Sequence, residues 1–487
     1  MRYAIIGAGM AGMLAAIKLL ERGCRDLIVY EKGHTIGGTW RENTYPGLTC
    51  DVPSHSYTYS FELNPDWTRT QPPGHEVQAY FEAVKEKYGL EEWITFNEEV
   101  VSCVYQHGRW QLKTASGRQD SADAVIAATG VLHHPRYPDI SGIDAFQGAI
   151  FHSAEWDHST PLDGQRIAII GTGSTGVQLV SALSTRASVL THFQRSPQWI
   201  MPVEDRAYTT HELARFKNNP DVLQSLHYDE ELESNIERYT AAITNPDSEA
   251  MQEIETIVAD FLAMAVTDAD LREKIRPDYR AACKRLIYSP NFYQAIQRDN
   301  VEVLVENVTR IEAKGIRGAD GRLREFDVIV LATGYKPHEF MRPMNIVGSN
   351  GTILNNVWRD KPVAYLSISI PDFPNFFMLN GPNGPVGNFS LIEIAECQWA
   401  YIEQLLAELE TGKCQEISAT QQAMAEYEHA RVEQAKKTIF ASGCSSWYLD
   451  SKGVPATWPW TRRDFKAAMQ KPDLTHFLTV GNAMNRP

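Results

Sequence analysis

The sequence has few cysteines and no close pair of them. Seven cysteines occur in 487 residues, at 24, 50, 103, 283, 397, 414 and 444, and no two are spaced as Cys-x-x-Cys. This pattern predicts neither a disulfide framework nor a zinc or other metal site, and it argues against a catalytic dithiol. It is typical of a protein from the reducing cytosol.

Long apolar runs and an excess of positive charge are also missing. The longest apolar stretches, such as Val328–Ala332, are far shorter than the ~20 residues that a membrane helix needs. Met1-Arg2 leads directly into a predicted strand, so we expect no signal peptide. The net charge of −15 argues against a nucleic-acid partner. We therefore expect a cytoplasmic protein with neither a membrane nor a nucleic-acid partner.

A strand, a glycine turn and a helix occur in this order twice along the chain. Residues 3–6 predict the first strand, which is followed by a helix through Leu20 and a strand at 26–30. The pattern restarts with a strand at 166–170 and continues to a strand at 188–193. Two such units predict an α/β fold with two Rossmann-like dinucleotide-binding domains.

Two other segments differ from these units. Alternating runs at 92–96, 100–106 and 109–114 predict an antiparallel meander. Residues 207–280 are polar, acidic and rich in helix-forming residues, and they predict a helical insertion in the second unit.

The first glycine turn, Gly7-Ala8-Gly9-Met10-Ala11-Gly12, joins a strand to a helix. Gly7 permits the tight turn, Gly9 lets a pyrophosphate approach the backbone, and Gly12 lets the helix pack closely. Glu31, at the end of the next strand, would accept hydrogen bonds from ribose hydroxyls. A turn with a purely structural role is the alternative.

The second turn, Gly171-Thr172-Gly173-Ser174-Thr175-Gly176, differs at the ribose position. The spacing of 24 residues that leads from Gly7 to Glu31 leads from Gly171 to Arg195. A guanidinium forms charge-assisted hydrogen bonds with a 2′-phosphate, whereas a carboxylate repels it. With Ser196 as a further donor, the second site is predicted to hold NADPH and the first FAD. A solvated surface arginine is the alternative.

Two longer patterns resemble type I Baeyer–Villiger monooxygenases, a group of class B flavin-dependent monooxygenases. Residues 146–157 match the family pattern F-x-G-x-x-x-H-x-x-x-W-[PD]. The pattern [AG]-G-x-W-x4-[FY]-P-[GM]-x3-D is matched by Gly37, Gly38, Trp40, Tyr45, Pro46, Gly47 and Asp51. The segments 283–286, 332–335 and 446–448 are also similar to the family, so the resemblance spans nearly the whole chain.

The resemblance implies roles for particular residues near the flavin. Asp51 and Arg285 would lie over the flavin, pair with each other and serve catalysis. Taken alone, Asp51 is more simply a turn cap and Arg285 part of a surface salt bridge. The residues of the same motif region that would contact FAD are Gly38, Thr39, Trp40 and Tyr57.

The resemblance also implies roles near NADP. Lys284 would bind the 2′-phosphate beside Arg195, and Trp447 would reach the nicotinamide half. His152 and Trp156 would act as hinge and cofactor-coupling residues between the two nucleotide units. A satisfied core histidine and a packing tryptophan remain the alternatives for His152 and Trp447.

The activity that the resemblance implies is an NADPH- and dioxygen-dependent conversion of ketones to esters or lactones. It passes through a flavin peroxide and a tetrahedral adduct, with FAD and NADP as cofactors and a small ketone as substrate. One rival is a flavin monooxygenase that oxygenates nitrogen or sulfur. Another is a non-oxygenating pyridine-nucleotide reductase or a redox-sensing binding protein.

The expected domain organisation follows the two nucleotide units. Residues 1–145 would form the first part of an FAD-binding domain, and 331–487 its second part with a C-terminal tail. Residues 146–330 would form the NADP-binding domain with its insertion. The insertion, the loop at 380–390 and the tail are expected to wall the substrate pocket.

Overall fold

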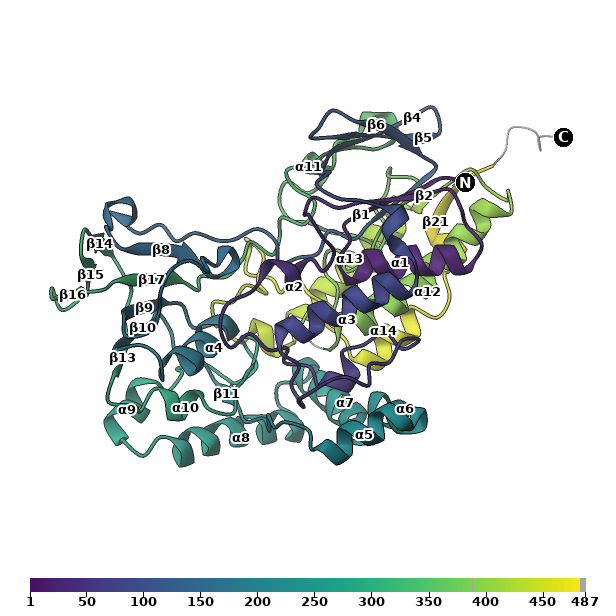
Figure 1. Cartoon of the computed structure of the whole chain (residues 1–487). Coiled ribbons are helices and arrows are strands. Elements are labelled where there is room, and N and C mark those ends of the chain that lie inside the picture. Colours follow the sequence, from purple (N-terminus) through teal and green to yellow (C-terminus); the bar gives the residue numbers. More distant parts are fainter. Residues whose placement is uncertain (388, 482–487) are drawn as a thin grey trace.

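The computed structural model describes residues 1–387 and 389–481, which form two lobes that share one chain (Figure 1). Residue 388 of the expected pocket loop and residues 482–487 of the expected tail lie outside the described residues. Each lobe is built on a five-stranded sheet in which all neighbouring strands are parallel. The α/β fold with two Rossmann-like units is therefore confirmed.

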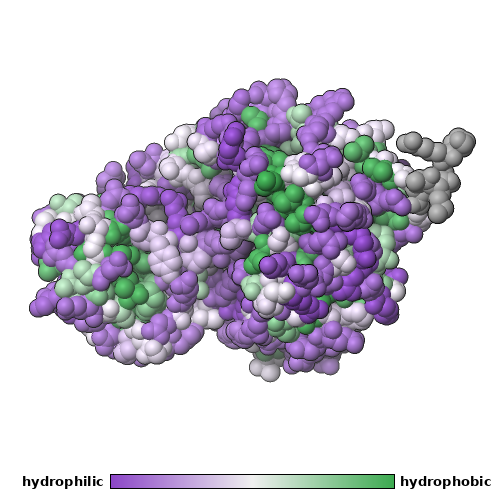
Figure 2. All heavy atoms as spheres, turned by 90° about the horizontal axis from the view of Figure 1, so that it is seen from above, coloured by the Kyte–Doolittle hydropathy of each residue, from purple (hydrophilic) through white to green (hydrophobic). Residues whose placement is uncertain are grey.

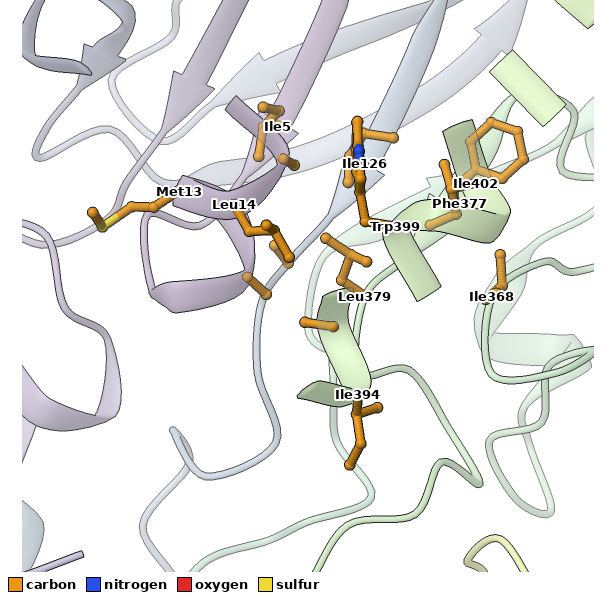
Figure 3. Packing of buried hydrophobic residues seen from close by; sticks show 14 of the residues in the cluster. Ile5, Met13, Leu14, Ile126, Ile368, Phe377, Leu379, Ile394, Trp399 and Ile402 are labelled. Carbon is orange, nitrogen blue, oxygen red and sulfur yellow. The ribbon is translucent and has the colours of Figure 1, made fainter. Parts of the chain in front are cut away.

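The first sheet has the strand order β19-β7-β1-β2-β3 and draws its strands from distant parts of the chain. Its strands are β1 (Tyr3–Ile6), β2 (Leu27–Tyr30), β3 (Ile94–Thr95), β7 (Ala124–Ala127) and β19 (Phe376–Met378). The main core lies between this sheet and the helices α1 (Met10–Glu21) and α12 (Leu391–Glu410) (Figure 3). Ile5, Leu14 and Ile402 are each fully buried there, and burial of such a side chain contributes about 1.5–3 kcal/mol.

The second sheet has the order β13-β10-β9-β17-β8. Its strands are β8 (Ala149–His152), β9 (Arg166–Ile170), β10 (Val189–Gln194), β13 (Val301–Val305) and β17 (Val328–Leu331). The helix α4 (Ser174–Leu183) follows the second glycine turn, with Gly173 as its N-cap. Its burial pattern places Val177, Val180 and Leu183 in the core of this lobe.

A four-stranded sheet of order β18-β4-β5-β6 packs onto the first lobe. Its strands are β4 (Val100–Gln106), β5 (Arg109–Thr114), β6 (Gln119–Ala122) and β18 (Asn345–Val347). The predicted antiparallel pairing of 100–106 with 109–114 is confirmed. The prediction that 92–96 belongs to this meander is wrong, because β3 instead pairs in parallel with β2 through Val29 and Ile94. Alternation of apolar residues marks a strand but does not specify its neighbour.

The segment at 207–280 is helical, as predicted, and it reaches both lobes. Its helices are α5 (Thr210–Asn218), α6 (Pro220–His227), α7 (Glu230–Thr244), α8 (Glu249–Ala265) and α9 (Ala269–Lys274). In Figure 1 they run along the bottom of the molecule, with α7 against α14 (Arg462–Ala468) and α8 against β11 (Ile200–Met201). The C-terminal part adds α13 (Gln421–Ala435) and the antiparallel strands β20 (Glu416–Ala419) and β21 (Phe477–Val480).

One cysteine pair corrects the expectation of no disulfide. Cys283 and Cys444 form a disulfide although they are 161 residues apart in the sequence. The other five cysteines are free. Spacing rules find pairs that are close in sequence, whereas the fold brings these two together from the segment that follows the insertion and from the C-terminal tail.

The face of the molecule that is seen in Figure 2 is mostly hydrophilic. Seen from above, apolar residues show only in small groups between polar ones (Figure 2). None of the helices within 1–387 and 389–481 is long and apolar enough to cross a membrane.

A buried arginine joins the insertion to the first lobe. Arg462, at the start of α14, is only 3% exposed. Its Nη1 donates to Glu233 at 2.8 Å and to Glu237 at 3.1 Å, both on α7. Its Nε donates to Glu393 on α12 at 3.0 Å. These carboxylates compensate the buried positive charge of Arg462. Removal of the guanidinium would leave them close together without a cation between them.

We expect Arg462→Met to lower the free energy of unfolding by about 3 kcal/mol, since breaking one side of a buried ion pair is strongly destabilising. Arg463→Met is the matched control because Arg463 is the exposed neighbour, and its effect is expected to stay within about 0.5 kcal/mol. Thermal unfolding of the two variants measures the difference. Equal midpoints would show that the cluster contributes nothing to stability.

Candidate functional site

A cavity of about 1230 Å³ is lined by both glycine turns and by segments of both lobes. Most of the residues that were predicted as site residues contribute to its wall. Those from the first lobe are Gly7, Gly9, Glu31, Gly38, Thr39, Trp40, Asp51 and Tyr57. Those from the second lobe and the tail are Gly171, Thr172, Gly173, Ser174, Thr175, Arg195, Ser196, Lys284, Arg285 and Trp447.

The first glycine turn has the close approaches that its sequence predicts. Gly7 has a φ of +102°, and a Cβ there would lie 2.5 Å from the Ala128 carbonyl oxygen. A Cβ on Gly12 would lie 1.8 Å from the Gly7 carbonyl oxygen, so α1 packs directly on the turn. The second turn repeats this arrangement, with Gly171 against the end of β17 and Gly176 against Gly171. The middle glycines of the two turns, Gly9 and Gly173, line the cavity, where the lack of a side chain lets a pyrophosphate approach the backbone.

Glu31 is held in place by three donors. Its carboxylate accepts hydrogen bonds from the Ala8 N–H at 2.8 Å and the Gly33 N–H at 2.7 Å. It also pairs with Arg41 at 2.7 Å. The sequence prediction did not include Arg41, because nothing in the spacing marks it. The carboxylate is thus fixed at the end of β2, where a ribose would lie.

Arg195, Ser196 and Lys284 come together on the other side of the cavity. Lys284 Nζ donates to Ser196 Oγ at 2.9 Å and lies 4.1 Å from the centre of the Tyr279 ring. Burial, and then the positive charge of Arg195, lowers the pKa of Lys284. Two cations that repel each other beside a hydroxyl donor form a site suited to a dianion such as a phosphate. Tyr279 carried no sequence signal.

Asp51 and Arg285 form an ion pair inside the cavity. Arg285 Nη2 donates to Asp51 Oδ2 at 2.5 Å and Nε donates to the same oxygen at 3.2 Å. The side chain of Arg285 is 29% exposed and that of Asp51 is 25% exposed, and this exposed surface lines the cavity. Burial alone would lower the pKa of Arg285, but the charge of Asp51 outweighs it and raises the pKa above its usual range. The guanidinium therefore stays charged at every pH of interest.

Two tyrosines adjoin this pair. A Cβ on Gly387 would lie 2.2 Å from Tyr448 Oη and 2.5 Å from Arg285 Nη1, so this glycine makes room for both groups. Tyr288 lines the cavity, and burial raises its pKa to about 12. Its phenol is therefore neutral at neutral pH. Neither tyrosine was predicted as a site residue, and Gly387 was predicted only as part of the loop at 380–390 that is expected to wall the substrate pocket.

The family pattern around Trp40 has a clear geometry. Trp40 Nε1 donates to Tyr57 Oη at 3.0 Å, and the two rings meet edge to face with centroids 5.5 Å apart. Further along, Tyr45 Oη donates to Gln178 on α4 at 2.8 Å. A Cβ on Gly47 would lie 2.8 Å from Ala182 Cβ. The pattern thus includes both a cavity wall and the surface that α4 of the other lobe packs against.

The residues of the 146–157 pattern lie outside the described wall of the cavity. His152 is fully buried at the end of β8, where its Nδ1 accepts a hydrogen bond from the Ala154 N–H at 3.1 Å. Trp156 packs edge to face on Phe151 with centroids 5.0 Å apart. Trp447, in contrast, is 39% exposed, lines the cavity and stacks on Tyr448.

Comparison with known proteins agrees with this geometry. A model of the pyridine nucleotide-disulphide oxidoreductase family matches residues 4–259. An uncharacterised monooxygenase of Mycobacterium tuberculosis is 44% identical over 99% of this chain and 98% of its own length. A Baeyer–Villiger monooxygenase of Streptomyces coelicolor is 36% identical over 98% of this chain and 92% of its own. One of Pseudomonas aeruginosa is 34% identical over 98% and 91%.

Solved structures show the same likeness across both lobes. Cyclohexanone monooxygenase from Rhodococcus sp. Phi1 bound to NADP⁺ superposes with a TM-score of 0.86 at 27% identity, covering 99% of both chains. Oxidised steroid monooxygenase bound to NADP superposes with a TM-score of 0.86 at 26% identity. The chain therefore belongs to the pyridine nucleotide-disulphide oxidoreductase family and, within it, to the type I Baeyer–Villiger monooxygenases.

Proposed function

We propose that this protein is an FAD- and NADPH-dependent monooxygenase that converts ketones to esters or lactones with dioxygen. The observation that carries the proposal is the Asp51–Arg285 ion pair, which lies in a cavity lined by two dinucleotide-type glycine turns. The names of the relatives support it, since two are Baeyer–Villiger monooxygenases and two solved neighbours are named for cyclohexanone and steroid oxygenation.

The two cofactors are assigned by the charge at each ribose position. The first turn and Glu31 would hold FAD, while the second turn with Arg195, Ser196 and Lys284 would hold NADPH. We accordingly assign residues 1–145 and 331–487 to the FAD-binding domain and residues 146–330 to the NADP-binding domain. A carboxylate would repel a 2′-phosphate, whereas the cation pair attracts it.

FAD reduced by NADPH would supply the activated oxygen, and the chain's own residues would supply position and charge. Arg285 places a permanent positive charge where negative charge develops on the ketone oxygen, which is the role of an oxyanion-hole donor. Asp51 fixes the guanidinium through two hydrogen bonds to one oxygen. Cofactors and ketone that fill the cavity would displace water from the exposed surface of this pair, which would strengthen each of these interactions.

The rival reading, oxygenation of nitrogen or sulfur, would use the same two glycine turns. It has no need of a permanent cation beside a developing oxyanion, because the acceptor carries no carbonyl oxygen. The Asp51–Arg285 pair therefore favours ketones.

The first test is a product screen with linear, cyclic and aryl ketones in the presence of NADPH and air. We expect at least one ketone to give an ester or lactone with one NADPH consumed per product. Gas chromatography of the products and NADPH absorbance measure both quantities. Turnover of sulfides and amines while every ketone stays inert would favour the rival.

The second test concerns Arg285. Arg285→Ala should still bind FAD, because the first turn is untouched, but should lower ester formation by on the order of 10²–10³. Arg285→Lys should lose nearly as much, since an ammonium lacks the planar fork that holds Asp51.

Arg280→Ala is the matched control for this series. Arg280 lies in the same segment but pairs with Glu255 outside the described cavity wall. The rate of ester formation by Arg280→Ala should stay close to that of the wild type. Near-normal ester formation by Arg285→Ala would remove Arg285 from the mechanism.

The third test concerns the choice of nucleotide. A hydrogen bond to a charged group contributes roughly 1.5–3 kcal/mol, so Arg195→Ala should weaken NADPH binding about ten- to a hundredfold. NADH, which lacks the 2′-phosphate, should be unaffected. Lys284→Ala should act in the same direction but less strongly. Steady-state KM values for both nucleotides measure these changes.

Arg186→Ala provides the control, because Arg186 belongs to the same lobe as Arg195 but pairs with Asp163 at the surface. Equal weakening of NADPH and NADH in Arg195→Ala would contradict the assignment of the phosphate site. A wild-type preference for NADH would contradict it as well.

A further inference from the structure

The Cys283–Cys444 disulfide joins two segments that line the cavity. Cys283 directly precedes Lys284 and Arg285, and Cys444 lies three residues before Trp447. Lys284, Arg285 and Trp447 all contribute to the cavity wall. The covalent bond therefore ties the segment that carries Arg285 to the segment that carries Trp447.

The C-terminal partner of this bond lies in a loop whose residues are mostly exposed. Ala441, Ser442, Gly443 and Ser445 are exposed, and Trp447 is 39% exposed. Within 441–448 the buried residues are Cys444 and Tyr448, and both belong to a small cluster with Cys283, Leu286 and Phe440. The disulfide is thus the covalent attachment of this loop, beside the packing of Tyr448 on Phe440 and the contact of Tyr448 with Arg285.

We propose that Cys283 and Cys444 are a reversible thiol–disulfide site whose oxidation by a low-molecular-weight disulfide fixes Trp447 for NADP binding. In a reducing cytosol the pair would be present as two thiols, with the loop held by packing alone. The inference rests on the NADP site of the proposed function, which includes Lys284 beside Cys283, and it adds Trp447 of the same cavity wall as the residue through which the bond would act.

The chemistry is two successive thiol–disulfide exchanges. Cys444, which is 7% exposed whereas Cys283 is fully buried, reacts first: its thiolate attacks one sulfur of the small disulfide and releases one thiolate. The Cys283 thiolate then attacks Sγ of Cys444 and displaces the second small thiolate. Two protein thiols lose two electrons and two protons, and the small disulfide is reduced to two thiols. A small thiol in excess reverses both steps.

The test compares NADP⁺ binding by the FAD-loaded protein after treatment with oxidised glutathione or with dithiothreitol. Peptide mapping under non-reducing conditions should find the Cys283–Cys444 peptide in the first sample and two free thiols in the second. Calorimetry should give a Kd for NADP⁺ roughly two- to tenfold larger in the reduced sample, the effect expected from one weakened contact.

A double variant and a matched control make the test specific. Cys283→Ser with Cys444→Ser should bind NADP⁺ like the reduced wild type under both conditions. Cys397→Ser should keep the full redox response, because Cys397 is a free, partly exposed cysteine on α12.

Three results would overturn the inference. The first is that oxidised glutathione does not link Cys283 to Cys444. The second is that dithiothreitol does not reduce their disulfide in the folded protein. The third is that the oxidised and reduced proteins bind NADP⁺ with equal affinity. Wild type that binds no NADP⁺ in either state would refute the proposed NADP site as well. Inert ketones together with redox-dependent NADP⁺ binding would refute the proposed reaction alone.

Discussion

The ion pair between Asp51 and Arg285 is the interaction on which the arrangement of this molecule depends. Each charge comes from a different part of the chain, and neither is stable away from bulk water without the other. The two segments must therefore approach each other closely. Gly47 permits this on one side, since a Cβ there would meet α4 of the second lobe. The lobes are thus fitted together around a pair of charges rather than around an apolar interface alone.

The remaining attachments hold parts of the chain around this pair. Arg462 fastens the insertion to α12 of the first lobe, and the disulfide fastens the C-terminal loop to the segment of Arg285. Tyr448 completes the enclosure, with Gly387 leaving space for its hydroxyl beside the guanidinium. An ionic cluster, a covalent bond and side-chain packing thus each join segments that are far apart in the sequence.

The sequence predicted the parts of the fold that repeat a local rule. A strand, a glycine turn and a helix define each nucleotide unit, because the close approach of Gly12 to Gly7 leaves no room for a side chain. Asp51 and Arg285 could be paired only through the family resemblance, since they are 234 residues apart. Arg41 was missed although Glu31 lies only 10 residues away, because no motif marks this side-chain pairing. Tyr448 and the disulfide were missed because each depends on contacts between distant segments. The placement of β3 was wrong for the same reason.

The cation pair at the second turn has one more consequence. Lys284 and Arg195 repel each other when no anion lies beside them, which is why the charge of Arg195 disfavours the protonated form of Lys284. A dianion that binds between the two cations removes this repulsion. The relief of repulsion therefore adds to the binding free energy of the dianion. Salt screens charges over about 8 Å at physiological ionic strength and over less in stronger solutions. The preference of this site for a ribose with a 2′-phosphate over one without it is therefore electrostatic. Concentrated salt would reduce this preference.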